Sequence, residues 1–278
     1  MKLEATDTVL ITGASGGLGV HIVRAFAQRG VRLALVAYPG NELTGLCAEV
    51  EKQGRESLAV VSDLRDPEER HKMLETVLQR FGRIDVLVNN AGIEFTSFYH
   101  ELDEQDILDV LNVNLQAPML LTRMVLPRML KERRGHVVNI SSLAGKSGPA
   151  FQESYSASKA ALIAFTASLR ATYKSTGFSA SVIVPGFVEA GIYSRLKARA
   201  GHSAPKLLGS LPPESVARAI LRAIERDQQE VICNRFPVRP LLALSALFPS
   251  IGQWITEKIG TNNFFRQVVQ AAPERRAG

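Results

Sequence analysis

The chain has 278 residues, of which 46% are hydrophobic and 22% charged, and this is enough apolar material to bury the core of one large domain. It contains two cysteines, Cys47 and Cys233, which excludes a disulfide-rich scaffold, and no spaced set of Cys and His indicates a metal site. The net charge of +6 is spread along the chain without interleaved aromatic residues, which argues against a nucleic-acid-binding platform.

The first predicted element is a strand over residues 8–12, followed by a glycine-rich turn and a helix over residues 20–29. In this context Gly13 permits a tight turn, Gly17 lets the backbone approach a phosphate, and Gly19 lets the helix pack on the strand. The helix N-terminus offers free N–H groups and a positive dipole end to a pyrophosphate. The pattern therefore predicts a dinucleotide-binding turn, with a glycine turn that binds no ligand as the alternative.

Strands and helices alternate along the rest of the first 233 residues. The expected strands are 31–37, 57–62, 84–88, 137–140, 179–184 and 230–233. The expected helices are 41–53 with Asn41 as its N-cap, 67–81, 103–115, 118–131, 154–173 and 213–226. This order predicts an α/β protein with a doubly wound parallel sheet, the three-layer α/β/α Rossmann fold, which binds ligands at the carboxyl ends of its strands.

The helix expected at residues 154–173 carries a tyrosine and a lysine one turn apart, Tyr155 and Lys159. A neighbouring ammonium favours the phenolate and lowers a pKa that is about 10 in water. Ser142, on the loop after the preceding strand, could hold an oxygen next to the phenol. These residues predict a proton-transfer site for an alcohol/carbonyl pair, although each alone is also typical of a solvated helix or a capped loop.

Together the motifs resemble those of the short-chain dehydrogenase/reductase family. The match covers Thr6 to about Cys233, and its motifs are Thr12-Gly-Ala-Ser-Gly-Gly-Leu-Gly19, Asn89-Asn-Ala-Gly92, Asn114, Ser142, Tyr155-Ser-Ala-Ser-Lys159 and Pro185-Gly186.

The resemblance implies a role for each of four catalytic residues. Tyr155 would be the general acid/base, and Lys159 would lower its pKa and hold the nicotinamide ribose. Ser142 would fix the substrate oxygen, and Asn114 would hold a water in the proton relay, with a helix kink as the alternative reading of Asn114.

The resemblance also implies a cofactor site. Asp63 and Leu64 would lie beside the adenine, Asn90 and Ala91 near the adenosine ribose, and Val188 would offer backbone groups to the carboxamide, while a plain turn is the alternative for Asn90. The full set of implied cofactor-binding residues is Gly13, Ser15, Gly17, Leu18, Gly19, Tyr38, Asp63, Leu64, Asn90, Ala91, Gly92, Tyr155, Lys159, Pro185, Gly186 and Val188.

Two positions depart from the family pattern. A threonine often stands where this chain has Ala190, so its carboxamide contact is lost or moved to another residue. Members that use NAD place an acidic residue at the end of the second strand, where this chain has Ala37 and then Tyr38. Without that acid a 2′-phosphate is not repelled, so we expect NADP rather than NAD, with the phosphate bound by backbone N–H groups, Ser15 or Tyr38.

We expect residues 1–233 to form a single catalytic domain, with residues 187–211 as an irregular lid, and residues 234–278 to form an apolar C-terminal extension. Pro249 interrupts the apolar run of the extension, so we expect it to pack on the domain, on a partner subunit or on a membrane surface rather than to span a bilayer. There is no signal-peptide pattern, and we expect a cytoplasmic protein, either free or membrane-associated. Small residues on the catalytic helix favour a homodimer or homotetramer: Ala157, Ala160, Ala161 and Ala164.

The predicted function is that of an NAD(P)-dependent oxidoreductase that interconverts a secondary alcohol and a ketone. The apolar lid residues Phe187, Ile192, Tyr193 and Leu196 favour a hydrophobic substrate that resembles a lipid, steroid or retinoid. One alternative is a 3-oxoacyl-thioester reductase of the fatty-acid type. A non-enzymatic alternative is a cofactor-binding scaffold or sensor.

Overall fold

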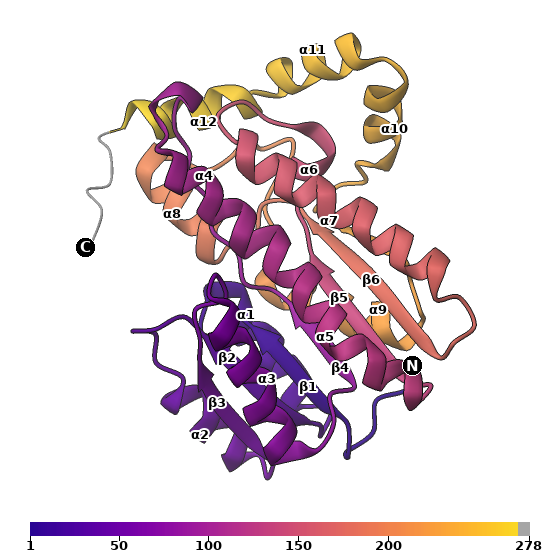
Figure 1. The fold of residues 1–278 in the computed structure, drawn as a ribbon. Coiled ribbons are helices and arrows are strands. Elements are labelled where there is room, and N and C mark those ends of the chain that lie inside the picture. The colour runs from indigo at the N-terminus through magenta and orange to yellow at the C-terminus, as the bar shows by residue number, and fades with distance from the viewer. Residues whose placement is uncertain (272–278) are drawn as a thin grey trace.

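The computed structural model describes residues 1–271 and contains one seven-stranded sheet in which all neighbouring strands are parallel (Figure 1). The strand order is β3-β2-β1-β4-β5-β6-β7. Strands β1 to β3 are therefore added toward one edge of the sheet and β4 to β7 toward the other, and the switch point lies between β1 and β4. This confirms the predicted doubly wound fold. The strands are β1 (Thr8–Thr12), β2 (Arg32–Ala37), β3 (Ser57–Val61), β4 (Val86–Asn89), β5 (Gly135–Ile140), β6 (Phe178–Pro185) and β7 (Glu230–Cys233).

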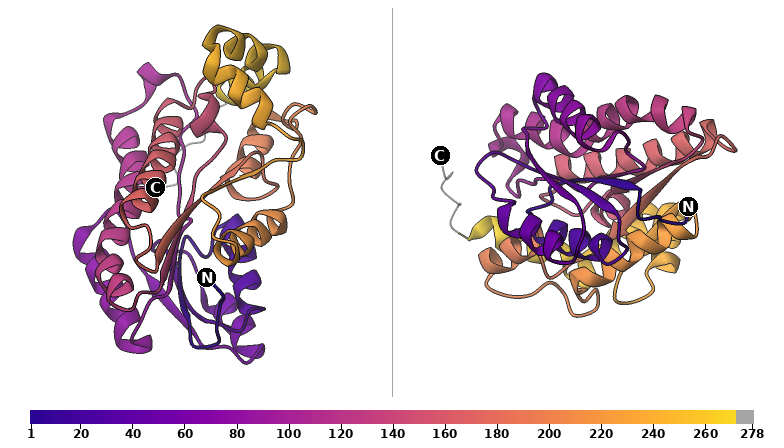
Figure 2. Two further views of the ribbon diagram at one scale, coloured as in Figure 1. Left: turned by 90° about the vertical axis from the view of Figure 1, so that its right-hand side faces the viewer. Right: turned by 90° about the horizontal axis from the view of Figure 1, so that it is seen from below.

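Helices cover both faces of the sheet, as the view along the strands shows (Figure 2). The helices are α1 (Gly17–Ala27), α2 (Thr44–Lys52), α3 (Pro67–Phe81), η1 (Tyr99–Glu101), α4 (Glu104–Leu111), η2 (Asn112–Gln116), α5 (Ala117–Lys131), α6 (Ala144–Ser147), α7 (Glu153–Thr172), α8 (Gly191–Ala200), α9 (Pro213–Glu225), α10 (Arg239–Leu247), α11 (Pro249–Ile259) and α12 (Thr261–Gln270).

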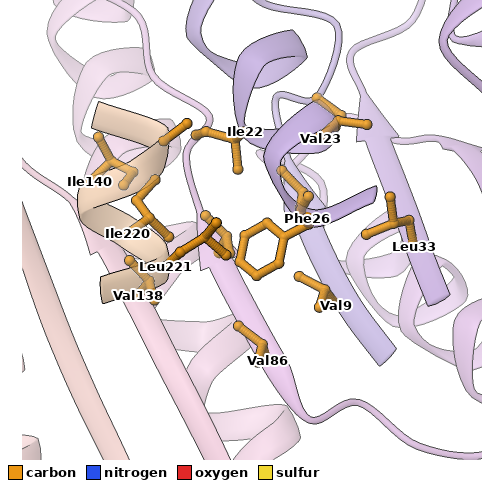
Figure 3. Close-up of a cluster of buried hydrophobic side chains, with 14 of the residues drawn as sticks. Val9, Ile22, Val23, Phe26, Leu33, Val86, Val138, Ile140, Ile220 and Leu221 are labelled. Carbon is orange, nitrogen blue, oxygen red and sulfur yellow. The ribbon is translucent and has the colours of Figure 1, made fainter. Parts of the chain in front are cut away.

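The two faces of the sheet bury separate apolar clusters. On one face α1 and α9 place Phe26 and Ile220 against Val9 and Val138 of the central strands (Figure 3). On the other face α3 and α5 pack against the sheet through side chains such as Leu121. The central strands are buried on both sides because their sequences are almost continuously apolar, as expected for a parallel sheet.

Three local predictions differ from the structure. Asn41 is not a helix cap, because α2 begins later, at Thr44, and Leu43 occupies the N-cap position. The Asn41 N–H donates to the carbonyl oxygen of Tyr38 in a turn before the helix. The helices expected at 103–115 and 118–131 form one continuous run, joined by the wider π-type turn η2. The lid is not irregular throughout, since α8 occupies its centre.

The C-terminal helices lie beyond the carboxyl ends of the strands. Phe264 and Phe265 of α12 pack on Tyr193 and Leu196 of α8, which joins the lid to the end of the chain. α10 and α11 form a hairpin that projects from this end of the molecule (Figures 1 and 2). Within residues 1–271, no helix combines the length and the apolar character needed to cross a membrane, and residues 272–278 of the expected extension lie outside the described residues.

Candidate active site

A cavity of about 320 Å³, the main cavity, opens at the carboxyl ends of the central strands. Its walls come from the glycine loop before α1, the loop after β5, the start of α7, the lid and the helices α10 to α12. A second cavity of about 350 Å³ continues past the ends of β2 and β3. Both are lined by Gly13, Gly16, Ala91 and Gly92, so together they make one groove across the sheet edge.

Tyr155, Lys159 and Ser142 meet in the main cavity. α7 carries the tyrosine and the lysine on successive turns, and Lys159 Nζ lies 5.6 Å from the centre of the Tyr155 ring. The ammonium donates a 2.9 Å hydrogen bond to the carbonyl oxygen of Ile140 at the end of β5, and the Ser141 hydroxyl donates to the Lys159 carbonyl at 2.7 Å. These two hydrogen bonds fix the position of α7 relative to the end of β5.

The acidities of this pair follow from burial. Removal from water raises the pKa of Tyr155 to about 12, an effect that a hydrogen bond with Ser142 opposes and the Glu94 charge reinforces. Burial also lowers the pKa of Lys159 to about 8. Burial and the Glu94 charge therefore act against the lowering of the Tyr155 pKa that we expect from Lys159, and that lowering stays a prediction. Near pH 7 the site holds a neutral phenol that can donate a proton.

Asn114 sits in the turn η2 and lines neither cavity. Its side chain is fully buried, and it accepts a hydrogen bond from Ile93 N–H and donates to Ile93 O, both at 2.9 Å, and to the Ser158 hydroxyl at 3.2 Å. A methyl group placed on Gly92 would lie 3.4 Å from both Asn114 Oδ1 and Lys159 Nζ. Asn114 Oδ1 and Lys159 Nζ therefore face the same small space. A water molecule that passes a proton between them would have to lie in this space.

The glycine motif lets backbone segments pack so closely that a side chain would clash. A Cβ on Gly19 would lie 2.1 Å from the carbonyl oxygen of Gly13, and one on Gly17 would lie 2.3 Å from the backbone nitrogen of Gly191 at the start of the lid. Gly13 has a φ of 64°, which favours glycine. The N-terminus of α1 receives no side-chain cap from Gly16. Its first N–H groups are thus available to an anion.

Asn90 supports this loop through its side chain, which donates 3.0 Å hydrogen bonds to the carbonyl oxygens of Thr12 and Gly13. Thr12 was not predicted as a site residue, yet its hydroxyl accepts from the N–H groups of Asn90 and Ala91, each at 3.1 Å. Its place as the last residue of the first strand, next to the glycines, is the signal that could have identified it.

The second cavity is lined by Asp63 and Leu64, which are predicted beside the adenine, and by Ser15 and Tyr38, which are predicted to meet a 2′-phosphate. It adds Arg65, which the sequence did not single out. The Arg65 guanidinium bonds Asp63 and Asp109 at 2.7 and 2.6 Å, donates to the Tyr38 hydroxyl at 3.0 Å, and lies 5.4 Å from the centre of that ring. Among the described residues that line this cavity, Arg65 is the one with a positive charge.

The remaining predicted residues lie in the wall of the main cavity: Leu18, Pro185, Gly186 and Val188. The wall also contains Gln152, a buried side chain missed at the sequence level. Gln152 stands three residues before Tyr155, and its amide donates to the Thr96 hydroxyl and, at 3.3 Å, to Glu94. A polar residue at the N-cap position of the catalytic helix, three residues before the tyrosine, is the signal that would have indicated it.

The groove fits a nicotinamide dinucleotide. The uncapped N-terminus of α1 lies at the middle of the groove, and glycines line the groove there. Tyr155 and Lys159 lie at one end of the groove, and Tyr38 and Arg65 lie at the other.

Comparison with known proteins agrees with this geometry. The family model for short chain dehydrogenases matches residues 7–200. The ketoacyl reductase HetN of Nostoc sp. (strain PCC 7120) is 39% identical over 246 residues, covering 88% of this chain and 84% of that protein. The 3-oxoacyl-[acyl-carrier-protein] reductase FabG of Thermotoga maritima is 35% identical over 227 residues, covering 80% of this chain and 91% of that protein.

Two solved structures share the fold. A short-chain dehydrogenase from Sphingobium yanoikuyae in complex with NADPH has a TM-score of 0.75 and 26% identity, covering 90% of this chain and 95% of that one. A metagenomic short-chain oxidoreductase in complex with NADP has a TM-score of 0.70 and 30% identity, covering 84% of this chain and 98% of that one. On these matches and on its site, the chain belongs to the short-chain dehydrogenase/reductase family of oxidoreductases.

Proposed function

We propose that the protein is an NADP-dependent oxidoreductase that interconverts a secondary alcohol and a ketone on a hydrophobic substrate. The observation that carries the proposal is the main cavity itself. It joins Ser142, Tyr155 and Lys159 to the glycine loop, and most side chains of its opposite wall, from the lid and the C-terminal helices, are apolar.

The chain's own residues would handle the proton and the substrate oxygen. Bound NADP supplies or accepts the hydride at the reacting carbon. Ser142 would hold the substrate oxygen next to the Tyr155 hydroxyl. Tyr155, with its pKa raised to about 12, would give its proton to that oxygen during reduction. Lys159 would bind the nicotinamide ribose, and the space between Lys159 and Asn114 would hold the water that returns the proton.

The preference for NADP rests on the second cavity. No acidic residue follows β2 at Ala37 and Tyr38, and Arg65 offers a guanidinium beside Tyr38. Two structural relatives are described in complex with NADP or NADPH. We propose that Arg65 binds the 2′-phosphate, and that Asp63 and Asp109 hold the Arg65 guanidinium in place.

The test is a titration with NADPH and with NADH, followed by nicotinamide fluorescence. We expect tighter binding of NADPH. Arg65→Met should weaken NADPH binding by about ten- to a hundredfold, the value of a lost hydrogen bond to a charged group, and leave NADH binding nearly unchanged. Arg80→Met, which removes an exposed guanidinium paired with Glu56, is the matched control. Equal loss for both cofactors would contradict the role given to Arg65.

A second substrate class is favoured by the names of the relatives, a ketoacyl reductase and a 3-oxoacyl-[acyl-carrier-protein] reductase. The competing substrate would be a carrier-bound 3-oxoacyl group, reduced by NADPH while Ser142, Tyr155 and Lys159 keep the same roles. Rates with a lipophilic ketone and with an acetoacetyl thioester, each with NADPH, distinguish the two. Turnover of the thioester alone would replace the hydrophobic-ketone proposal, and cofactor binding without turnover of any carbonyl would favour the scaffold or sensor.

The remaining parts of the proposal concern organisation. Residues 1–233 would be the catalytic domain with the lid at 187–211, and residues 234–278 an added extension. We propose a cytoplasmic homodimer or homotetramer, in which the exposed alanines of α7, Ala157, Ala160 and Ala164, would face another subunit. The extension would contact membranes peripherally.

A further inference from the structure

The hairpin of α10 and α11 has two apolar faces, and only one of them is used inside the protein. Its inner face lines the main cavity through Leu241, Leu242, Ile255 and Ile259. None of the residues of α10 is fully buried, and α11 buries only Gly252. An amphipathic helix on a globular core normally buries its apolar stripe. This hairpin has a second stripe that points away from the core.

The outer stripe is exposed to an unusual degree. Leu247, Phe248, Ile251 and Trp254 are 74, 54, 43 and 58% exposed. Leu244 of α10 is 38% exposed, and Phe236, just before α10, is 46% exposed. The hairpin projects from the molecule (Figure 2), and several large apolar side chains of its two helices and their connection are exposed. Such a group indicates an interaction surface rather than scattered surface residues.

The charges around the stripe are basic. Residues 234–270 contain Arg235, Arg239, Lys258 and Arg266 against a single acid, Glu257, and all five are exposed. A tryptophan and aliphatic side chains bordered by Lys and Arg are typical of helices that lie in the interface of an anionic bilayer.

We propose that the outer face of α10 and α11, from Phe236 to Lys258, docks on the surface of a membrane that contains anionic lipids. Leu247, Phe248, Ile251 and Trp254 enter the interface, and Arg235, Arg239 and Lys258 contact lipid phosphates. Because the inner face of the same hairpin lines the main cavity, docking brings the cavity wall to the bilayer. A lipophilic substrate then passes from the lipid to Tyr155 without crossing water, a step that rests on the function proposed above.

Trp254 is the only tryptophan of the chain, so it reports docking directly. The full-length protein is titrated with vesicles of phosphatidylcholine, and with vesicles that also contain phosphatidylglycerol, while tryptophan emission and co-sedimentation are followed. We expect a blue shift and sedimentation with the anionic vesicles, and much less of both with the neutral ones or in 1 M salt.

Two matched variants sharpen the test. Leu247→Ser/Phe248→Ser keeps the reporter and should weaken vesicle binding at least about tenfold, since two large apolar groups no longer enter the interface. Val61→Ser/Leu108→Ser removes apolar side chains that are 59 and 41% exposed on β3 and α4 and should bind vesicles like the unchanged protein. Unchanged circular dichroism and NADPH titration establish that both variants are folded.

Several results would overturn the proposal. Binding that is equal for neutral and anionic vesicles would remove the role of the basic side chains, and equal binding by both variants would remove the role of the hairpin. A concentration-dependent blue shift without vesicles, together with a larger particle in light scattering, would assign the surface to a second copy of the chain. Docking is measured without substrate, so the docking result can be interpreted even if the protein has no activity on ketones. Conversely, a failure to dock would not contradict the proposed reaction.

Discussion

The two walls of the main cavity are built by different means. The wall that faces the cofactor is backbone: Gly13 lies against Ala91, Gly19 against Gly13, and the strand ends hold Lys159 through the carbonyl of Ile140. The wall that faces the substrate is made of side chains on α8, α10, α11 and α12, and α10 buries none of its residues. Sheet hydrogen bonds fix the first wall, whereas side-chain packing and a few hydrogen bonds outside the sheet, such as that from the Ala150 N–H to Asn262, fix the second. The chemistry can therefore stay constant while the substrate changes.

The largest expected effect belongs to the backbone wall, where Tyr155 projects into the cavity. Tyr155→Phe should lower turnover by about two to four powers of ten, because it removes the proton donor. NADPH affinity should change little, since the ring remains. The measurement is kcat together with a fluorescence titration, and turnover close to that of the unchanged protein would disprove the assigned mechanism.

Gly92→Ala should be the next most damaging change. Gly92 has an ordinary φ, so alanine fits the backbone, but its methyl group would enter the space shared by Asn114 and Lys159. We expect kcat to fall by about ten- to a hundredfold, part of the usual contribution of proton transfer, with the melting temperature nearly unchanged. Gly45→Ala on α2, where an added Cβ meets nothing within 4 Å, is the control. A variant as active as the control would show that no relay runs through this space.

The buried sheet also predicts a pH dependence of stability. His136 on β5 is buried beside the Ser181 hydroxyl, 2.8 Å from its Nε2, and burial lowers the pKa of His136 to about 3. Below an unfolded value of about 6.5 the unfolded chain binds a proton that the native protein does not, so stability falls as the pH falls, by about 1.4 kcal/mol per unit.

Urea unfolding at pH 7.0, 6.0 and 5.0 measures this dependence, using roughly unit steps below the unfolded pKa. His136→Gln does not titrate and should show a shallower loss with acid. The same slope in both proteins would mean that His136 is not the group responsible.

The smallest effect is expected on the substrate wall. Leu242→Ala removes part of one apolar side chain from the cavity and should raise KM for a long lipophilic ketone by about tenfold, the worth of burying that much apolar surface. For a short ketone that does not reach α10, KM and kcat should stay the same. A tenfold loss of kcat for the short ketone would mean that this wall also positions the reacting groups.

The same contrast explains what the sequence could predict. The alternation of strands and helices, the glycine turn and the pairing of Tyr155 with Lys159 follow from local patterns, because each depends on residues close together in the chain. The expected helix at 154–173 matches α7 within one residue at each end.

Long-range packing decided the rest. The pKa of Tyr155 rises because distant elements bury it. Arg65 is oriented by an ion pair with Asp109, which lies 44 positions further along the chain. The helices α10 to α12 reach the cavity by packing across the lid, which no periodicity in residues 234–270 specifies. The prediction of Asn41 as a cap was wrong because the turn that it forms with Tyr38 precedes the helix, which begins at Thr44.

The contact between Gly17 and Gly191 has a kinetic consequence. The lid starts against the glycine loop, Val188 bridges to Leu211 at its far end, and α8 between them lines the main cavity. One segment therefore borders both the phosphate position and the substrate position. A substrate bound under this segment would block the way in and out of the dinucleotide, which makes the reaction an ordered one. We expect the dinucleotide to add first and leave last, so that NADP⁺ inhibits competitively against NADPH and the alcohol product does not.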